Sequence, residues 1–140
     1  MRRMNRGMRS GFTLIELLLV LVILAVLAAV VVPKFTGQSE RARETRAGTD
    51  ITTIEGALER FEVDAGRYPT NDENLNALVE RPGNVKEWNG PYIKQLPKDP
   101  WGAEYQYRYP GTHNPNGFDL FSFGKDGREG NDDIDNWTQK

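Results

Sequence analysis

The 140-residue sequence contains no cysteine and a single histidine, His113. Without cysteine there is no disulfide framework, no thiol nucleophile and no cysteine-ligated zinc. One histidine also removes most zinc sites and catalytic triads. Four of the 18 basic residues precede residue 12, so residues 12–140 carry 14 basic and 20 acidic side chains. Such an acidic body argues against nucleic-acid binding, which needs a basic patch.

One apolar run stands out from a chain whose mean hydropathy is polar, at -0.62. Residues 14–32 read LIELLLVLVILAVLAAVVV, with Glu16 as the one charge. A membrane-spanning helix needs roughly 20 apolar residues. A cleaved secretory signal peptide is the alternative, but its apolar region has roughly 7–15 residues. An acid within a membrane span costs roughly 2.5–3.5 kcal/mol at its centre, so Glu16 marks a functional position.

Residues 11–16, with the sequence G-F-T-L-I-E, resemble the processing signal of type IV pilin-like proteins. The resemblance implies that a prepilin peptidase cuts between Gly11 and Phe12 on the cytoplasmic side and that Phe12 becomes N-methylated. Residues 1–11 would then be a cleaved basic leader, and the apolar run would stay on the mature protein. Basic residues on the two sides of the run nearly balance, so this resemblance also decides the orientation.

Glu16 has a physical reason to pair with the new N-terminus. Its carboxylate lies about four residues, or ~6 Å, along a helix from the Phe12 amine. In lipid, both groups are costly when unpaired. Pairing Glu16 of one subunit with the Phe12 amine of its neighbour satisfies both groups and sets the axial register of a filament. The pilin-like resemblance implies the same role.

The periodicity beyond the apolar run predicts a continuing helix. Pro33 ends or kinks a helix, yet apolar residues then recur at helical spacing: Ala47, Ile51, Ile54, Leu58, Phe61 and Ala65. We expect one helix over about 12–65, kinked at Pro33, with Gly66 as its stop. Its first part (12–33) is a transmembrane and filament-core helix. Its second part (34–66) is an amphipathic continuation.

Residues 67–140 are expected to form a loop and β-sheet domain. Thr70 and Glu73 fit a capping box before a short helical stripe, and strands are predicted at 105–109, 118–123 and 134–137. Five residues are expected as buried loop anchors: Trp88, Tyr92, Ile93, Leu96 and Trp101. The fold class is α+β, a long N-terminal helix packed on a small antiparallel sheet.

The C-terminal segment 119–135 contains six acidic residues. It is a solvated loop, with residues 126–127 as a simple turn, or a calcium site. Calcium takes six to eight oxygen ligands, and a domain this small without a disulfide often needs a metal. The spacing does not match an EF-hand loop.

Three further blocks resemble the major pseudopilins of the type II secretion system: residues 98–102 (KDPWG), 119–127 (DLFSFGKDG) and 131–137 (NDDIDNW). The resemblance implies a type IV pilin-like fold and one structural calcium. The implied ligands are the side chains of Asp126, Asp132 and Asp133 and the backbone carbonyls of Phe123 and Arg128. Two departures put the carbonyl set in question: a shorter connection between residues 126 and 132, and residues 68–77, which lack the usual T-x-x-Q-G-L.

The resemblance implies a structural subunit without catalytic activity. It would polymerise into the periplasmic pseudopilus that drives export of folded proteins from a Gram-negative bacterium. Its partners would be further copies, minor pseudopilins, the prepilin peptidase, and an inner-membrane assembly platform with a cytoplasmic ATPase. It would span the inner membrane once, with its C-terminal domain in the periplasm. The alternatives are a type IV pilin for adhesion, motility or DNA uptake, and an enzyme with a signal anchor. His113 in a turn gives little support to the enzyme.

Overall fold

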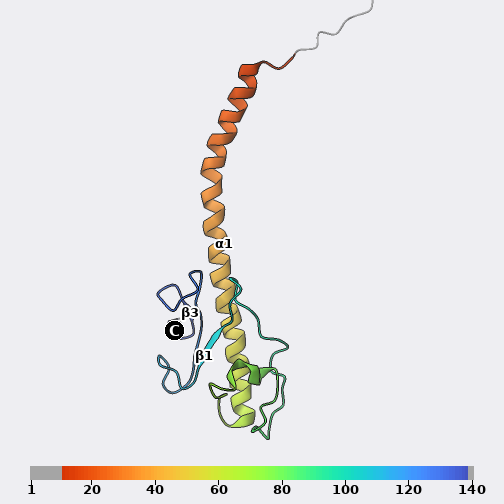
Figure 1. Ribbon diagram of the computed structural model, residues 1–140, viewed down its shortest axis with the longest axis vertical. Helices are drawn as coiled ribbons and strands as arrows, with labels where there is room; N and C mark the ends of the chain where they lie inside the picture. The colour runs from red at the N-terminus through yellow and green to blue at the C-terminus, as the bar shows by residue number, and fades with distance from the viewer. Residues whose placement is uncertain (1–10, 139–140) are drawn as a thin grey trace, which may run out of the picture. The chain divides into compact units, whose positions relative to one another are not determined.

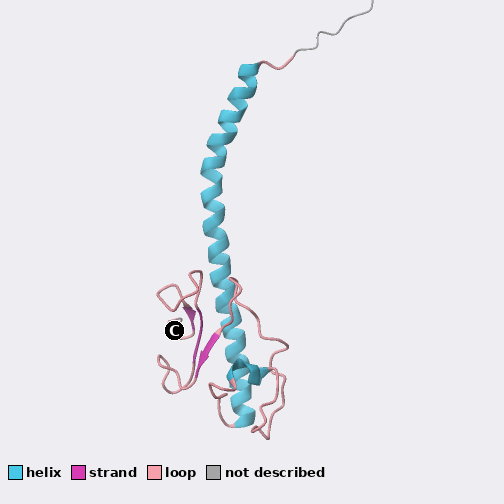
Figure 2. Ribbon diagram, in the orientation of Figure 1, coloured by secondary structure: helices cyan, strands magenta, loops and turns pink. Residues whose placement is uncertain are grey.

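The computed structural model describes residues 11–138, except for the side chains of residues 30–36, and divides into two units with a boundary between residues 39 and 40. Figures 1 and 2 show the order of its elements. These elements are helix α1 (Leu14–Ala65), the 3-10 helix η1 (Asn74–Leu78) and strands β1 (Gln106–Arg108), β2 (Asp119–Ser122) and β3 (Ile134–Asp135). The α+β class with a long N-terminal helix is therefore confirmed. Residues 1–10 of the predicted leader lie outside the described residues.

Local signals set both ends of α1. Thr13 precedes the helix and accepts the Glu16 N–H with its carbonyl at 3.2 Å and with Oγ1 at 3.3 Å, so α1 begins at Leu14 rather than at Phe12. At the other end Gly66 adopts φ +72°, a left-handed conformation that glycine takes without strain. The helical assignment runs through Pro33, and the predicted kink there stays a prediction.

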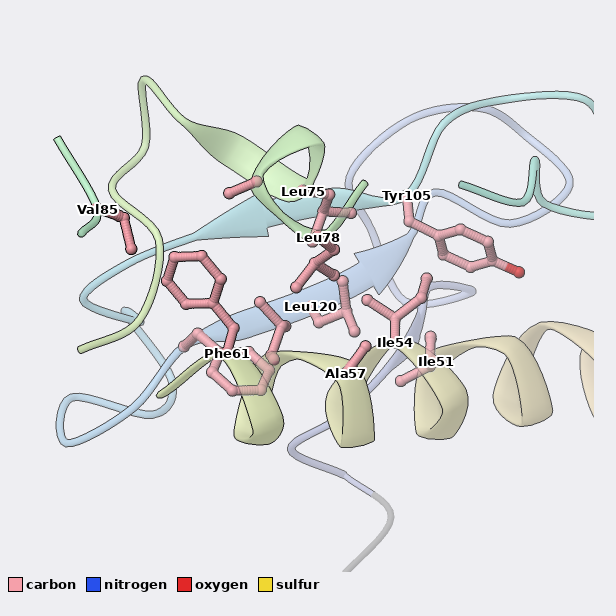
Figure 3. Packing of buried hydrophobic residues seen from close by; sticks show 12 residues of the cluster. Ile51, Ile54, Ala57, Phe61, Leu75, Leu78, Val85, Tyr105 and Leu120 are labelled. Atoms are coloured by element: carbon pink, nitrogen blue, oxygen red, sulfur yellow. The ribbon is translucent and has the colours of Figure 1, made fainter. Parts of the chain in front are cut away.

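The predicted apolar stripe is the helix's contribution to the core. Ile51, Ile54, Leu58 and Phe61 are 0–2% exposed. Figure 3 shows the labelled helix side chains directed toward those of η1 and β2. Each fully buried side chain of this size contributes roughly 1.5–3 kcal/mol. The amphipathic second half of the helix is thus bound to the domain by its own stripe.

The sheet is antiparallel with the order β1-β2-β3. All three strands are where they were predicted but are shorter. All four residues of β2 are buried, because it is the central strand and packs on both faces. Leu120 joins the helix core cluster. Phe121 packs edge-on against Phe123 and Trp137, at 5.5 Å between ring centroids in each case.

The predicted capping box is present, but the segment it opens is a 3-10 helix. The Thr70 N–H donates to Glu73 Oε2 at 2.8 Å, and the Glu73 N–H donates to Thr70 Oγ1 at 3.3 Å. Arg67 adds a two-pronged ion pair to Glu73 at 2.7 and 2.8 Å. This pair, opposed by partial burial, lowers the pKa of Glu73 to about 2. Leu75 and Leu78 then carry η1 into the core.

The loop over residues 82–102 differs from the expectation in how deeply its aromatic residues are buried. The five predicted anchors are half-buried rather than buried. The polar atoms of Trp88 and Tyr92 are hydrogen-bonded: the Trp88 indole donates to the Ala77 carbonyl at 2.9 Å, and the Tyr92 hydroxyl donates to Asp64 Oδ2 at 2.6 Å. Val85, which no pattern singled out, is 5% exposed and belongs to the core.

Acidic side chains along α1 accept hydrogen bonds from distant segments of the domain. Each receives a donor far away in sequence, from an indole, a phenol or an amide. The pairs are Glu40 with Trp101 (2.8 Å), Asp50 with Tyr105 (2.9 Å), Glu55 with Asn136 (3.0 Å) and Asp64 with Tyr92 (2.6 Å). These bonds supplement the apolar stripe and determine which helical residue each segment meets.

Candidate functional site

The predicted processing and assembly residues lie at the start of the described chain. Gly11 and Phe12 are exposed, and Phe12 is 82% exposed. A Cβ added to Gly11 would touch nothing within 4 Å among the described residues. Glu16 is exposed in the first turn of α1, where a negative charge interacts favourably with the helix dipole. The cleavage, the methylation and the register role of Glu16 stay predictions.

The described apolar side chains in the first part of α1 are exposed. Large apolar residues from Leu14 to Leu27 are between 48% and 79% exposed. In the part of the chain that the structure describes, no helix is both long and apolar enough to cross a membrane. Residues 30–33 of the predicted span lie outside the described side chains, and the transmembrane assignment stays a prediction.

The acidic terminal loop folds on itself through glycine conformations and short-range bonds. Gly124 adopts φ +66°, and a Cβ there would lie 2.5 Å from the Asp132 carbonyl oxygen. Asp126 Oδ1 accepts the Arg128 N–H at 2.8 Å, which confirms a turn at this point. Asp133 Oδ2 accepts the Gly130 N–H at 3.2 Å. The three predicted acidic ligands, at positions 126, 132 and 133, thus lie in one short folded segment.

The environment of the Asp133 carboxylate is electrostatically unfavourable. Its Oδ1 is buried and has no hydrogen-bond partner among the described residues. Burial raises the pKa of Asp133, and the negative charges of Asp132, Glu129 and Asp126 raise it further, against the bond from Gly130. A buried carboxylate oxygen without a partner is costly. A cation bound beside it would offset the repulsion between the neighbouring carboxylates and would give Asp133 Oδ1 the contact that it lacks.

The donor set suits calcium in its chemistry. All three predicted side chains are carboxylates, the ligand type that calcium prefers. Within residues 11–138, however, no three acidic or histidine side chains are already arranged to hold a metal ion. Glu129 turns instead toward Arg108, at 3.8 Å. Phe123 is half-buried and Arg128 exposed, and their carbonyls stay predicted ligands.

Two of the acidic residues in segment 119–135 have a structural role instead. Asp119 is fully buried and accepts the N–H groups of residues 112–114. Burial alone would raise its pKa, but the bonds from His113 and Asn114 lower it below the ordinary value. His113 also stacks on Trp137 with 4.0 Å between ring centroids. Asp135 is 5% exposed and caps the turn that follows β3.

Ser122 and Asp99 are the buried polar residues that the sequence patterns missed. Ser122 Oγ donates to Asp99 Oδ2 at 2.6 Å, and both residues are less than 5% exposed. Asp99 stood in the KDPWG block, but nothing in that block indicated burial. Ser122 lay in a predicted strand, but nothing in the sequence pattern identified it as a buried polar residue.

Two family models together match most of the chain. Residues 34–138 match the model described as type II secretion system (T2SS), protein G, and residues 6–32 match the prokaryotic N-terminal methylation motif. The chain belongs to the type II secretion system protein G family. The first match covers the domain with its terminal loop, and the second covers the predicted processing signal and the apolar run.

Relatives and a solved structure agree with this family. The chain is 45% identical to the type II secretion system core protein G of Vibrio cholerae, with 99% of this chain and 97% of the relative covered. It is 49% identical to the same core protein of Pseudomonas aeruginosa, with 96% and 99% covered. The crystal structure of the major pseudopilin from the type 2 secretion system of enterohaemorrhagic Escherichia coli matches with TM-score 0.65 and 37% identity, covering 74% of this chain and 90% of that one.

The protein G family decides between the two filament hypotheses. It favours a pseudopilin over a type IV pilin for adhesion, motility or DNA uptake. The family is one of structural subunits, so the chain is part of a multi-subunit secretion machine in the bacterial envelope.

Proposed function

We propose that this protein G family member polymerises into the periplasmic pseudopilus of a type II secretion system and so drives the export of folded proteins. The proposal rests mainly on two matches to family models, one over residues 6–32 and one over residues 34–138. The exposed apolar side chains of α1 support it, because they need lipid or neighbouring helices to cover them. The work of the chain is self-association, and no residue is assigned a catalytic role.

The apolar segment explains the proposed localisation and partners. Residues 12–33 would hold the mature subunit in the inner membrane by a single pass, with the domain in the periplasm and Gram-negative bacteria as the source. A prepilin peptidase would cut after Gly11. An assembly platform with a cytoplasmic ATPase would move subunits into the filament, beside minor pseudopilins. There the same apolar side chains would contact other copies instead of lipid.

We further propose that one calcium ion stabilises the terminal loop. Asp126, Asp132 and Asp133 would supply side-chain oxygens, and Phe123 and Arg128 would supply carbonyls. The partnerless buried oxygen of Asp133 and the raised pKa of that residue support the proposal. The ion would supply only charge neutralisation and order, which a small domain without disulfides needs.

The test is complementation with the full chain in a bacterium that lacks its own core protein G. The expected result is restored appearance of secreted enzymes in the medium. Mass spectrometry of the recovered subunit should show an N-terminus at Phe12 carrying one methyl group. Recovery of a subunit shortened beyond the apolar run would contradict the proposal, since it would indicate a secretory signal peptide. A processed subunit that forms surface filaments but restores no secretion would favour the pilin alternative.

A further inference from the structure

The terminal loop is joined to the interior by a buried serine. Ser122 is fully buried at the end of β2. Its hydroxyl accepts the Gly124 N–H at 3.1 Å and donates to Asp99 Oδ2 at 2.6 Å. A hydroxyl both donates and accepts, so this one group connects the backbone of the loop to a carboxylate in another segment.

Asp99 continues the connection to α1. Its second oxygen, Oδ1, accepts the N–H groups of Trp101 and Ala103 at 3.1 and 2.7 Å. The Trp101 indole then donates to Glu40 Oε1 at 2.8 Å. The two bonds of the Ser122 hydroxyl are buried, and those from Trp101 and Ala103 are partly buried. Hydrogen bonds away from water strengthen one another along such a path.

At its other end, the path begins in direct contact with the acidic residues. Gly124 is buried, and the space that its missing Cβ would fill is occupied by Asp132, whose carbonyl oxygen lies 2.5 Å from that position. A displacement of Asp132 therefore acts on the Gly124 backbone, which is bonded to Ser122.

We propose that Ser122 and Asp99 are positioning residues that couple the placement of the terminal loop to the hydrogen bond between Trp101 and Glu40. Glu40 is the first residue of the unit that contains the domain. A change in the loop thus reaches the point in the sequence where this unit follows the apolar segment. The coupling depends on the bonds of the chain itself and does not require calcium. Any change that orders or displaces the terminal loop would be transmitted through these hydrogen bonds.

The experiment records the three tryptophan indole signals by ¹⁵N NMR on the full chain in detergent micelles, with a Trp101→Phe variant for assignment. The loop is perturbed by Gly124→Ala, which must displace Asp132. The expected result is a shifted Trp101 indole signal and about two- to tenfold faster exchange of its N–H, the effect of weakening one hydrogen bond. Trp88 is the internal control, because its indole donates to the Ala77 carbonyl, outside this path.

A matched variant controls for backbone strain. Gly66→Ala introduces a side chain at a similar φ, +72°, where a Cβ meets nothing within 4 Å and which lies outside the loop. It should leave Trp101 unchanged. If Gly66→Ala moves the Trp101 signal as much as Gly124→Ala does, the effect is general destabilisation and the proposal is wrong.

Removal of the serine hydroxyl completes the test. In a Ser122→Ala background, Gly124→Ala should still shift the Trp137 indole, which lines a cavity with Glu129 and Asp133, but should no longer shift Trp101. Ser122→Thr, which keeps the hydroxyl, should restore the response. An unchanged Trp101 response in Ser122→Ala would overturn the proposal, as would no response to Gly124→Ala alone.

Asp99→Asn is the second background, for use if Ser122→Ala does not fold. It keeps one carbonyl oxygen for the Trp101 and Ala103 N–H groups but replaces the oxygen that accepts the Ser122 proton with an NH2 group, which can only donate to the Ser122 hydroxyl. This neutral bond is weaker than the bond to the carboxylate, so the response of Trp101 should be smaller than in wild type. A Trp101 signal that responds to Gly124→Ala as strongly as in wild type would contradict the proposal.

Discussion

The ion pair between Arg67 and Glu73, just before η1, predicts a change in stability whose size can be worked out from the structure. Glu73 receives two bonds from Arg67 and one from the Thr70 N–H. Its pKa is lowered from the ordinary 4.5 to about 2, which corresponds to about 3 kcal/mol at neutral pH. Because the Arg67 side chain is 32% exposed, solvent screening reduces this to about 1–2 kcal/mol. Glu73→Gln should therefore lower the free energy of unfolding by about 1–2 kcal/mol at pH 7.

The sign of the pH dependence makes this prediction sharper. A lowered folded-state pKa means that the contribution is fully present above pH 4.5 and is lost as the pH falls through about 2. Denaturant melts of wild type and Glu73→Gln should therefore differ most above pH 4.5 and converge toward pH 2. Glu87→Gln, at an exposed position, serves as the control and should match wild type. A difference that stays constant from pH 7 to pH 2 would refute the electrostatic origin.

Three further changes test other parts of the molecule. Glu16→Ala should be processed normally but assemble poorly, as measured by sedimentation of filaments; normal filament yield would disprove the register role. Chelation by EDTA, or Asp126→Ala, should lower the melting temperature and secretion together, since a ligand at 100 times its Kd stabilises by about 2.7 kcal/mol; an unchanged melt in EDTA would argue against the calcium site. Phe61→Ala should cost about 3–5 kcal/mol in denaturant melts, whereas Val63→Ala, at a position 83% exposed, should stay within about 0.5 kcal/mol; equal losses would contradict the assigned core face.

The helix and its buried face could be predicted because periodicity is a local signal. Ile54, Leu58 and Phe61 have the helical spacing, and all three are fully buried. The Thr70 and Glu73 capping box was likewise local and is present. The short helix after this capping box could not be assigned as α or 3-10, because the spacing of apolar residues over a segment of only five residues is compatible with either.

The buried polar residues could not be predicted from local sequence patterns. Ser122 is buried because Asp99, 23 residues earlier, is placed to accept its proton. Asp119 was grouped with the acidic loop by composition, but the turn at residues 112–114 encloses it. The hydrogen-bond partners of these buried groups are brought together by contacts between segments far apart in sequence, and a local pattern does not reveal such contacts. The calcium ligands came from family resemblance, and only Asp133 gained independent physical support.

The row of acids on α1 has a consequence for how the domain is assembled. Each acceptor lies at or before residue 64 and each donor at or after residue 92, with separations of 28 to 81 residues. None of these bonds can form within a local hairpin or turn, and the acids have their correct spacing only on a formed helix. The four bonds together therefore depend on a formed helix. Shortening α1 from its N-terminal side would remove acceptors in sequence order, with Glu40 and its bond to Trp101 lost first.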